Sequence, residues 1–235
     1  MSAVVVPQAQ PVQTTRIWLM AFDDCDQLDI TGPYEIFMQA ADSLKERDPV
    51  KHALELKIVA VPGATDDPNV VRARQGLRFG CEPRDPAEAL PDVLVIAGGL
   101  FGQDASGCDV GITKQLHNPA FTGLIMEQHG SGLIASVCTA ALALVGTNLA
   151  RGRTLTTHPG ILDMVVAGGA RVLNPDWEAR VVDAGDIVSC GGVTSGIDEA
   201  LYLVERLFPD DPALIDDVRR FVDYPYRATV KVFPR

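Results

Sequence analysis

The chain has 235 residues, of which 47% are hydrophobic, and a formal net charge of −11. This length and apolar content suit one α/β domain with a large core. The acidic balance argues against nucleic acid or an anionic membrane surface as a partner, because both attract clustered Lys and Arg. Small molecules remain as partners. Five cysteines without regular spacing indicate a reducing, cytoplasmic compartment.

The N-terminus has neither a basic start nor an apolar run of signal-peptide length. We therefore expect residues 1–15 to form a mobile tail and residues 16–235 to form a single domain. No apolar run approaches the ~20 residues that a membrane-spanning helix needs. The spacing of His and Cys fits no metal site, so we expect neither a metal nor an organic cofactor.

The first buried strand is predicted at residues 16–22, and an Asp-rich loop follows it. We expect a helix to start at Thr31–Pro33, because proline is favoured in a first turn. Asp29 then lies just after the strand, and Glu35 lies in the first turn of the helix. Open α/β sheets bind ligands at the carboxyl ends of their strands, which makes both carboxylates candidates. For Glu35, the alternative is an acid that only complements the helix dipole.

Two more strands are predicted, at residues 54–61 and 92–96, and the second ends in the sequence A-G-G-L-F-G. Gly98 and Gly99 let the backbone approach a ligand closely and offer amides to an anion. An ordinary tight turn is the alternative. The full G-x-G-x-x-G spacing is absent, so we predict no dinucleotide. A helix is expected over residues 112–129.

The segment 133–146 places Cys138 where an apolar strand turns into a helix. Ser136 and Ala140, on either side of the apex, are small, as a sharp strand–turn–helix junction requires. A thiol at a helix N-terminus meets unpaired amides and the positive end of the helix dipole, so we predict a lowered pKa and a nucleophilic thiolate at Cys138. An inert core thiol is the alternative.

After this strand–turn–helix junction, which we call the elbow, a strand is expected to lead to His158. His158 precedes a proline and is therefore held extended. Ser195 and Asp198 fit a capping box. The remaining predicted elements are a helix over 161–167, hairpin-like strands around 184–185, a helix over 195–208 and a short helix over 212–222.

The alternation of strands and helices predicts a three-layer α/β sandwich with a mainly parallel, flavodoxin-like sheet. Asp29, the Gly98–Gly99 pair, Cys138 and His158 each follow a predicted strand. Because parallel strands end at the same edge of a sheet, we expect these groups to converge there.

Five segments in this order also resemble the ThiJ/PfpI superfamily of class I glutamine amidotransferase-like proteins: L-D-I-T-G-P-Y-E-I-F, I-A-G-G, S-V-C-T-A-A, T-T-H-P and G-G-V-T-S-G-I-D-E-A. Within it, L-D-I-T-G-P and S-V-C-T are most similar to isonitrile hydratases. The resemblance implies that Cys138 is the nucleophile, Asp29 the carboxyl group bonded to its sulfur and Thr139 a supporting hydroxyl. It also implies an anion hole formed by the amides of Gly99 and Thr139, and a homodimer with the site near its interface.

The activity implied is that of a cofactor-independent lyase, which converts an isonitrile to an N-substituted formamide through a thioimidate on Cys138. Two departures leave other activities open: Pro159 stands where isonitrile hydratases usually have Trp, and Ala97 replaces the proline before the glycine pair. His158 and Glu35 occupy the positions of the Cys–His–acid set of PfpI-type members. The alternatives are a glyoxalase or deglycase acting on small aldehydes and a non-enzymatic redox or ligand sensor.

Overall fold

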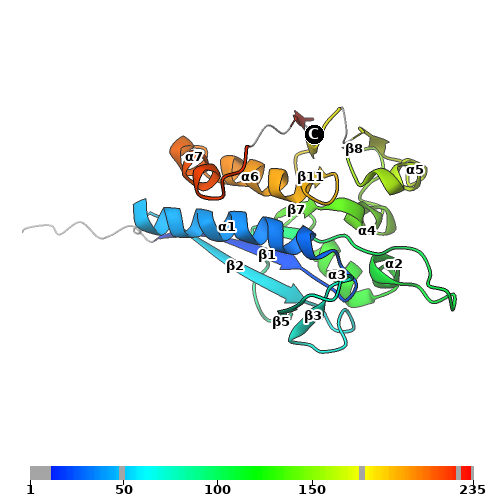
Figure 1. Cartoon of the computed structure of the whole chain (residues 1–235). Helices are drawn as coiled ribbons and strands as arrows, with labels where there is room; N and C mark the ends of the chain where they lie inside the picture. Colours follow the sequence, from blue (N-terminus) through cyan, green and yellow to red (C-terminus); the bar gives the residue numbers. More distant parts are fainter. Residues whose placement is uncertain (1–11, 48–50, 175–177, 226–228, 234–235) are drawn as a thin grey trace, which may run out of the picture.

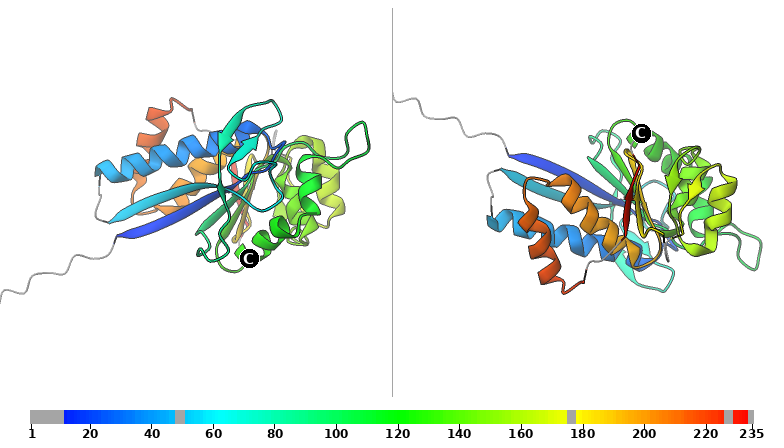
Figure 2. Two further views of the ribbon diagram at one scale, coloured as in Figure 1. Left: turned by 90° about the horizontal axis from the view of Figure 1, so that it is seen from below. Right: turned by 90° about the horizontal axis from the view of Figure 1, so that it is seen from above.

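A central eight-stranded sheet organises the computed structural model, which describes residues 12–47, 51–174, 178–225 and 229–233 (Figure 1). The strand order is β12-β10-β11-β7-β6-β1-β2-β5. Every pairing in this sheet is parallel except that of β10 with β11. Helices cover both faces of the sheet, as Figure 2 shows from below and above. The predicted three-layer, mainly parallel α/β sandwich is therefore confirmed.

The strands of the large sheet are β1 (Gln13–Met20), β2 (His52–Ala60), β5 (Glu82–Pro83), β6 (Val93–Ile96), β7 (Leu133–Ser136), β10 (Val181–Asp183), β11 (Ile187–Cys190) and β12 (Val230–Val232). Two small sheets pair β3 (Val70–Arg72) with β4 (Arg78–Gly80) and β8 (Thr154–Leu155) with β9 (Arg171–Val172).

One helical layer packs α1 (Gln27–Arg47) against α6 (Ser195–Leu207) and α7 (Pro212–Phe221). The other contains α2 (Gly111–Leu116), α3 (Pro119–Gln128), α4 (Ala141–Gly146) and α5 (Leu162–Ala167). Short 3-10 helices, η1 (Cys138–Ala140) and η2 (Pro159–Ile161), precede α4 and α5. Strands β6, β7 and β11 are buried along their whole length, as expected for parallel strands covered on both faces.

The N-terminal boundary differs from the expected one. Strand β1 begins at Gln13, so residues 13–15 belong to the sheet, where they pair with residues 52–54 of β2. The rest of the predicted tail, residues 1–11, lies outside the described residues.

The predicted start of α1 at Thr31–Pro33 is wrong, because the helix begins at Gln27 and contains Pro33 in its interior. Asp26, which the sequence places in a loop, accepts a hydrogen bond from the amide of Leu28 at 3.2 Å and thereby caps the helix. Asp29 consequently lies in the first turn of α1, whereas Glu35 lies beyond it, contrary to our prediction.

Two further expectations were wrong for local reasons. The helix expected over 112–129 is divided into α2 and α3 at Pro119, and the Asn118 side chain caps α3 by accepting the Ala120 amide at 3.0 Å. The Ser195–Asp198 capping box does not form, because the Asp198 carboxylate binds the Arg180 side chain at 2.7 Å instead. The strand pair around residues 184–185 is confirmed as the β10–β11 hairpin.

Among the helices of the described ranges, none is both long and apolar enough to cross a bilayer.

Candidate active site

Cys138 lies at a sharp junction between β7 and η1. Its backbone φ is +61°, in the left-handed region that residues other than glycine rarely adopt. The Cys138 amide donates to the carbonyl of Gly191, just after the neighbouring strand β11, at 3.1 Å, which holds the turn in place. Ser136 and Ala140 are both buried beside it, where larger side chains would crowd the apex. The predicted elbow geometry is therefore present, with the thiol only 4% exposed.

Asp29 is the carboxyl group that faces this thiol. Its side chain is completely buried and hydrogen bonds to the Cys138 sulfur. Oδ2 accepts the Gly98 amide at 3.0 Å, and Oδ1 has no hydrogen-bond partner. Burial, followed by the charge of Asp26, raises the pKa of Asp29 well above its usual value. Asp29 is therefore suited to holding a proton rather than to carrying a permanent charge.

The Cys138 pKa is also raised, by burial first and by the Asp29 carboxylate second. The Thr139 amide acts in the opposite direction but is outweighed. We predicted a lowered pKa from the helix dipole; however, the sulfur faces only a three-residue 3-10 helix and a six-residue α-helix, whose dipoles are small. Because both pKa values are raised, the Cys138–Asp29 pair holds its last proton more tightly than either group would alone, and we call this proton the shared proton.

The glycine pair after β6 supports these groups through hydrogen bonds. The Gly98 amide binds Asp29, while the Gly99 amide donates to Thr139 Oγ1 at 2.8 Å. The same hydroxyl donates back to the Gly99 carbonyl at 3.0 Å. A Cβ atom at Gly98 would lie 2.5 Å from the Thr139 nitrogen, so the close approach requires glycine. An anion hole that uses the Gly99 amide would require its bond to Thr139 to open.

His158 also lies at this site, although β8, the strand before it, pairs with β9 in a small sheet and not in the large one. A Cβ atom built on Gly192 would lie 2.5 Å from Cys138 Sγ and 2.6 Å from His158 Cδ2, so Gly192 separates the thiol from the imidazole. His158 Nδ1 accepts the Gly160 amide at 3.0 Å. A neutral ring in this arrangement carries its proton on Nε2. Glu35 is exposed on α1 and is not brought to this group within the protomer.

Four residues to which the sequence assigns no role surround the pair. Asp26 and Arg74 approach Asp29 from the solvent side, and Cys190 and Glu199 lie behind Cys138. Asp26 belongs to the acidic run that precedes α1, which was the one available signal. Glu199 lies in the segment G-G-V-T-S-G-I-D-E-A and Cys190 stands just before it, but the resemblance assigned neither residue a role. Arg74 comes from a turn with no recognisable pattern. In the described part of the chain, no cluster of three or more His, Cys, Asp or Glu side chains could hold a metal ion.

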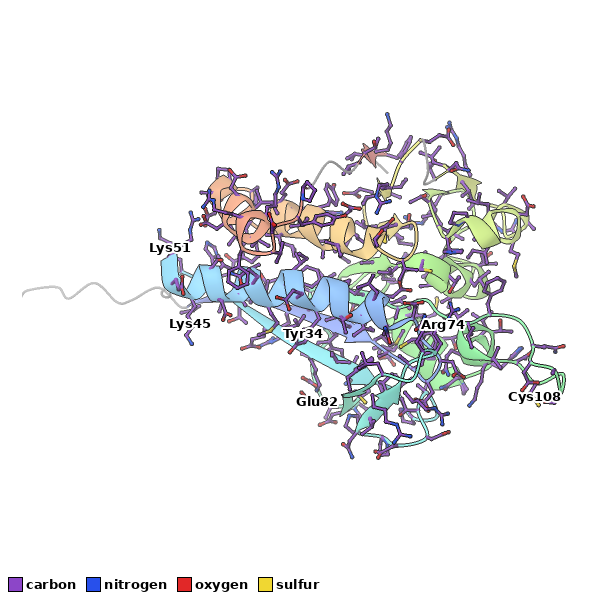
Figure 3. The ribbon with its side chains drawn as sticks, in the orientation of Figure 1. Tyr34, Lys45, Lys51, Arg74, Glu82 and Cys108 are labelled. Atoms are coloured by element: carbon purple, nitrogen blue, oxygen red, sulfur yellow. The ribbon has the colours of Figure 1, made fainter. Side chains whose placement is uncertain are left out.

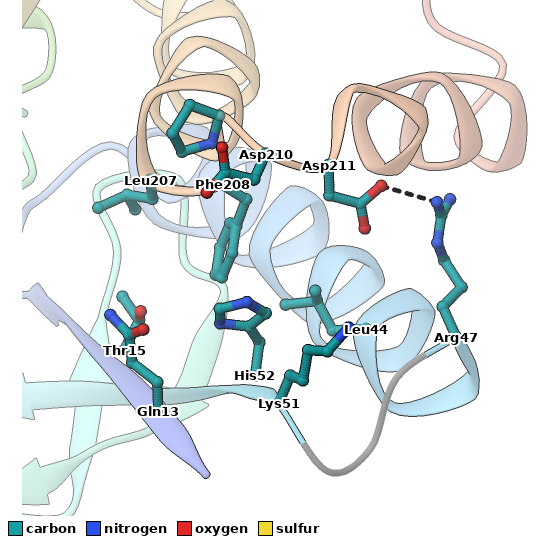
Figure 4. A pocket seen from close by; sticks show the side chains of 11 residues that line it. Gln13, Thr15, Leu44, Arg47, Lys51, His52, Leu207, Phe208, Asp210 and Asp211 are labelled. Carbon is teal, nitrogen blue, oxygen red and sulfur yellow. Dashed lines mark hydrogen bonds and ion pairs between the residues drawn. The ribbon is translucent and has the colours of Figure 1, made fainter. Parts of the chain in front are cut away.

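A pocket of about 640 Å³ lies at the opposite edge of the sheet, between the end of α1, the first residues of β1 and β2, and the α6–α7 connection (Figure 4). Phe208 and His52 pack edge to face within it, and Arg47 pairs with Asp211 at 2.7 Å on its rim. It contains no cysteine, so it is separate from the reactive thiol.

The model of the DJ-1/PfpI family matches residues 15–206 of this sequence. The chain belongs to the DJ-1/PfpI family. It is 28% identical to an isonitrile hydratase from Pseudomonas putida over 201 residues, which cover 84% of this chain and 74% of that protein. It is 35% identical to a Parkinson disease protein 7 homolog from Danio rerio over 118 residues, 49% of this chain and 56% of that protein.

Solved structures of the family share the fold. A ThiJ/PfpI family protein from Pseudomonas syringae superposes with a TM-score of 0.71 at 20% identity, over 96% of this chain and 82% of that one. DJ-1beta from Drosophila melanogaster also gives a TM-score of 0.71, at 16% identity, over 91% of this chain and 100% of that one. At these identities the similarity establishes the fold alone.

Proposed function

We propose that this protein is an isonitrile hydratase, in which Cys138 is the nucleophile and Asp29 moves the protons. The observation that carries the proposal is the arrangement of Asp29, which is buried against the Cys138 sulfur and oriented by the Gly98 amide. The similarity to the Pseudomonas putida isonitrile hydratase supports the same activity. The substrate is a small molecule, and no cofactor enters the reaction.

The first step uses the proton that the pair shares. With the proton on Asp29, the Cys138 thiolate forms a bond to the terminal carbon of the isonitrile R–N≡C. The lone pair on that carbon takes the proton from Asp29, which gives the thioimidate S–CH=N–R. Sulfur and proton thus reach the same atom, which requires a proton donor beside the sulfur, as Asp29 is.

The second step consumes water. Asp29, now ionised, removes a proton from water as the water oxygen adds to the thioimidate carbon, and it passes this proton to the nitrogen. When the C–S bond breaks, the thiolate leaves and the remaining hydroxyl proton returns to Asp29. The product is the formamide R–NH–CHO, and the net change is the addition of one water.

The hydrogen bonds of the glycine pair favour this chemistry over addition to an aldehyde. Attack on a carbonyl creates an oxyanion, which free amide donors normally stabilise. Here the Gly98 amide is bonded to Asp29 and the Gly99 amide to Thr139. Addition to an isonitrile places no charge on oxygen in the first step. We therefore assign Gly98 to orienting Asp29, and Thr139 to holding the Gly99 turn.

The imidazole also fits a general base poorly. His158 Nδ1 already accepts a hydrogen bond from Gly160, and Nε2 of the neutral ring carries a proton. His158 would need to break the bond to Gly160 before it could accept a proton from a substrate. If Glu35 of a partner subunit reached His158, it would meet an imidazole whose Nδ1 already accepts the Gly160 amide.

A panel with an alkyl isonitrile, an aryl isonitrile, methylglyoxal and a chromogenic ester tests the proposal. We expect formamide from the isonitriles, no formamide from Cys138→Ala, and wild-type rates from Cys108→Ala, which removes an exposed thiol. Conversion of methylglyoxal without any isonitrile turnover would replace the hydratase by the aldehyde chemistry. If no compound is converted but one equivalent of peroxide oxidises Cys138, the sensor alternative replaces both.

A further inference from the structure

Asp26 and Arg74 make a second charged pair beside the candidate active site. Arg74 lies in the turn between β3 and β4, and its NH1 is 3.6 Å from Asp26 Oδ2. The Asp26 side chain is 6% exposed and that of Arg74 is 41% exposed, so the pair lies at the boundary between the site and solvent. Figure 3 shows Arg74 beyond the N-terminal end of α1, the end that bears Asp29.

Asp26 is built into the framework that holds Asp29. Its amide donates to the Gly98 carbonyl at 2.9 Å, and its own carbonyl accepts the Asp29 amide at 3.1 Å. Its carboxylate caps α1 at Leu28 and accepts the Gln75 side-chain amide at 3.3 Å. Asp26 is therefore fixed by four contacts, each to a segment next to the reacting pair.

The β3–β4 turn is fixed to the same loop. The Arg74 amide donates to the Cys25 carbonyl at 3.0 Å, and the Asp24 amide donates to the Arg72 carbonyl at 2.9 Å. Asp23 accepts the amide of Arg72 at 2.8 Å. These bonds keep the Arg74 charge at a defined place relative to Asp29.

We propose that Asp26 and Arg74 are positioning residues whose opposite charges set the pH at which the Cys138–Asp29 pair releases its shared proton. The inference deepens the proposed function and rests on it only for the identity of the reacting pair. The negative charge of Asp26 opposes a further negative charge on the pair, and the positive charge of Arg74 favours one. Neither residue touches the reacting atoms.

Other titratable groups also surround Asp29, and their charges act on it together with those of Asp26 and Arg74. Cys25 shares its loop, Cys138 faces it from the elbow, and Cys190 and Glu199 approach from β11 and α6. His158 lies across Gly192 from the thiol. Arg74 is the only cation among these groups of the described chain, and its side chain is far more exposed than that of Asp26.

The rate of alkylation of Cys138 by iodoacetamide, measured against pH, tests the inference without any isonitrile turnover. Asp26→Asn keeps an oxygen that can cap α1 but removes the charge. We expect the midpoint of the curve of alkylation rate against pH to move to lower pH by about one unit. Arg74→Gln keeps the main-chain bond to Cys25, and we expect a shift of about one unit to higher pH. Peptide mass spectrometry assigns the alkylated thiol.

Two control variants and one double variant distinguish the effect of the charges from damage to the fold. Asp66→Asn and Arg78→Gln remove exposed charges of the same region, and we expect the wild-type midpoint from each. The double variant Asp26→Asn/Arg74→Gln should return towards the wild-type midpoint, whereas structural damage would accumulate. Shifts in one common direction, unchanged midpoints, or a double variant that departs further from wild type would overturn the inference. If the protein hydrates no isonitrile but the midpoint moves to lower pH in Asp26→Asn and to higher pH in Arg74→Gln, the proposed function is contradicted and the inference is not.

Discussion

Gly192 lies so close to Cys138 that a Cβ atom on it would be 2.5 Å from the sulfur, well inside van der Waals contact. The same atom would meet His158 Cδ2 at 2.6 Å. The space between the thiol and the imidazole is therefore filled by the main chain of residue 192, and the absence of a side chain there leaves room for both groups.

We expect Gly192→Ala to reduce isonitrile turnover by at least about 100-fold, because the methyl group displaces either the sulfur or the imidazole from its position. Steady-state kinetics measure the loss, and the melting temperature shows whether the fold persists. Gly123→Ala on α3, where an added Cβ atom meets nothing within 4 Å, is the matched control. A Gly192→Ala protein with the wild-type rate would mean that the reacting groups do not use this space.

Substitution of the proton carriers separates the two enzymatic interpretations. Losing a general acid–base typically costs 10²–10⁴-fold in rate. We therefore expect Cys138→Ala and Asp29→Asn to lose isonitrile turnover by at least about 100-fold, and His158→Asn to lose less than about tenfold. The initial rate of formamide production measures both effects. A folded His158→Asn protein that is more damaged than Asp29→Asn would favour the Cys–His–acid chemistry.

Glu199 predicts a specific dependence of stability on pH. Burial raises its pKa well above the usual value, and its carboxyl retains an unpartnered oxygen. Between the ordinary unfolded-state pKa and this raised folded-state pKa, the folded protein binds a proton that the unfolded chain does not. The free energy of unfolding contributed by Glu199 is therefore fully present at low pH and declines as pH rises through that window.

Glu199→Gln removes this titration, so we expect its stability to decline less than that of the wild type between about pH 5 and pH 8. Urea unfolding at several pH values measures the difference. Glu127→Gln, which removes an exposed carboxylate on α3, serves as the control. Parallel pH profiles for Glu199→Gln and the wild type would contradict the prediction.

The protein is expected to act as a homodimer, as the family resemblance implies. Phe221 near the end of α7 is 67% exposed, and Tyr224 follows it, so this surface retains apolar area that a second copy would cover. Tyr226, a further aromatic residue of this tail, lies outside the described residues. Light scattering measures the oligomeric state. A monomer with full turnover at the assay concentration would exclude any contribution of Glu35 across subunits.

The sequence predicts the sheet well because its strands β6, β7 and β11 are short continuous apolar runs with no competing helical pattern. It also predicts that Asp29 and Cys138 meet, since both follow strands of the large parallel sheet. The expectation for His158 rested on the same argument, but β8 pairs with β9 in a small sheet of its own. It could not predict the start of α1, because the capping role of Asp26 depends on a side-chain bond to Leu28 that an acidic loop does not reveal. The raised pKa of Cys138 was missed for a related reason: burial is a property of the assembled layers, and it outweighs a short helix.

The last strand of the chain has a consequence for truncation. β12 pairs with β10 and so covers an edge of the large sheet, although it lies beyond residues 15–206 that the family model matches. Removing residues 229–235 would leave the β10 backbone groups that now face Val230–Val232 open to another strand. A shortened protein would therefore keep every reactive group yet gain a surface prone to aggregation, so that the boundary chosen for expression affects solubility before it affects chemistry.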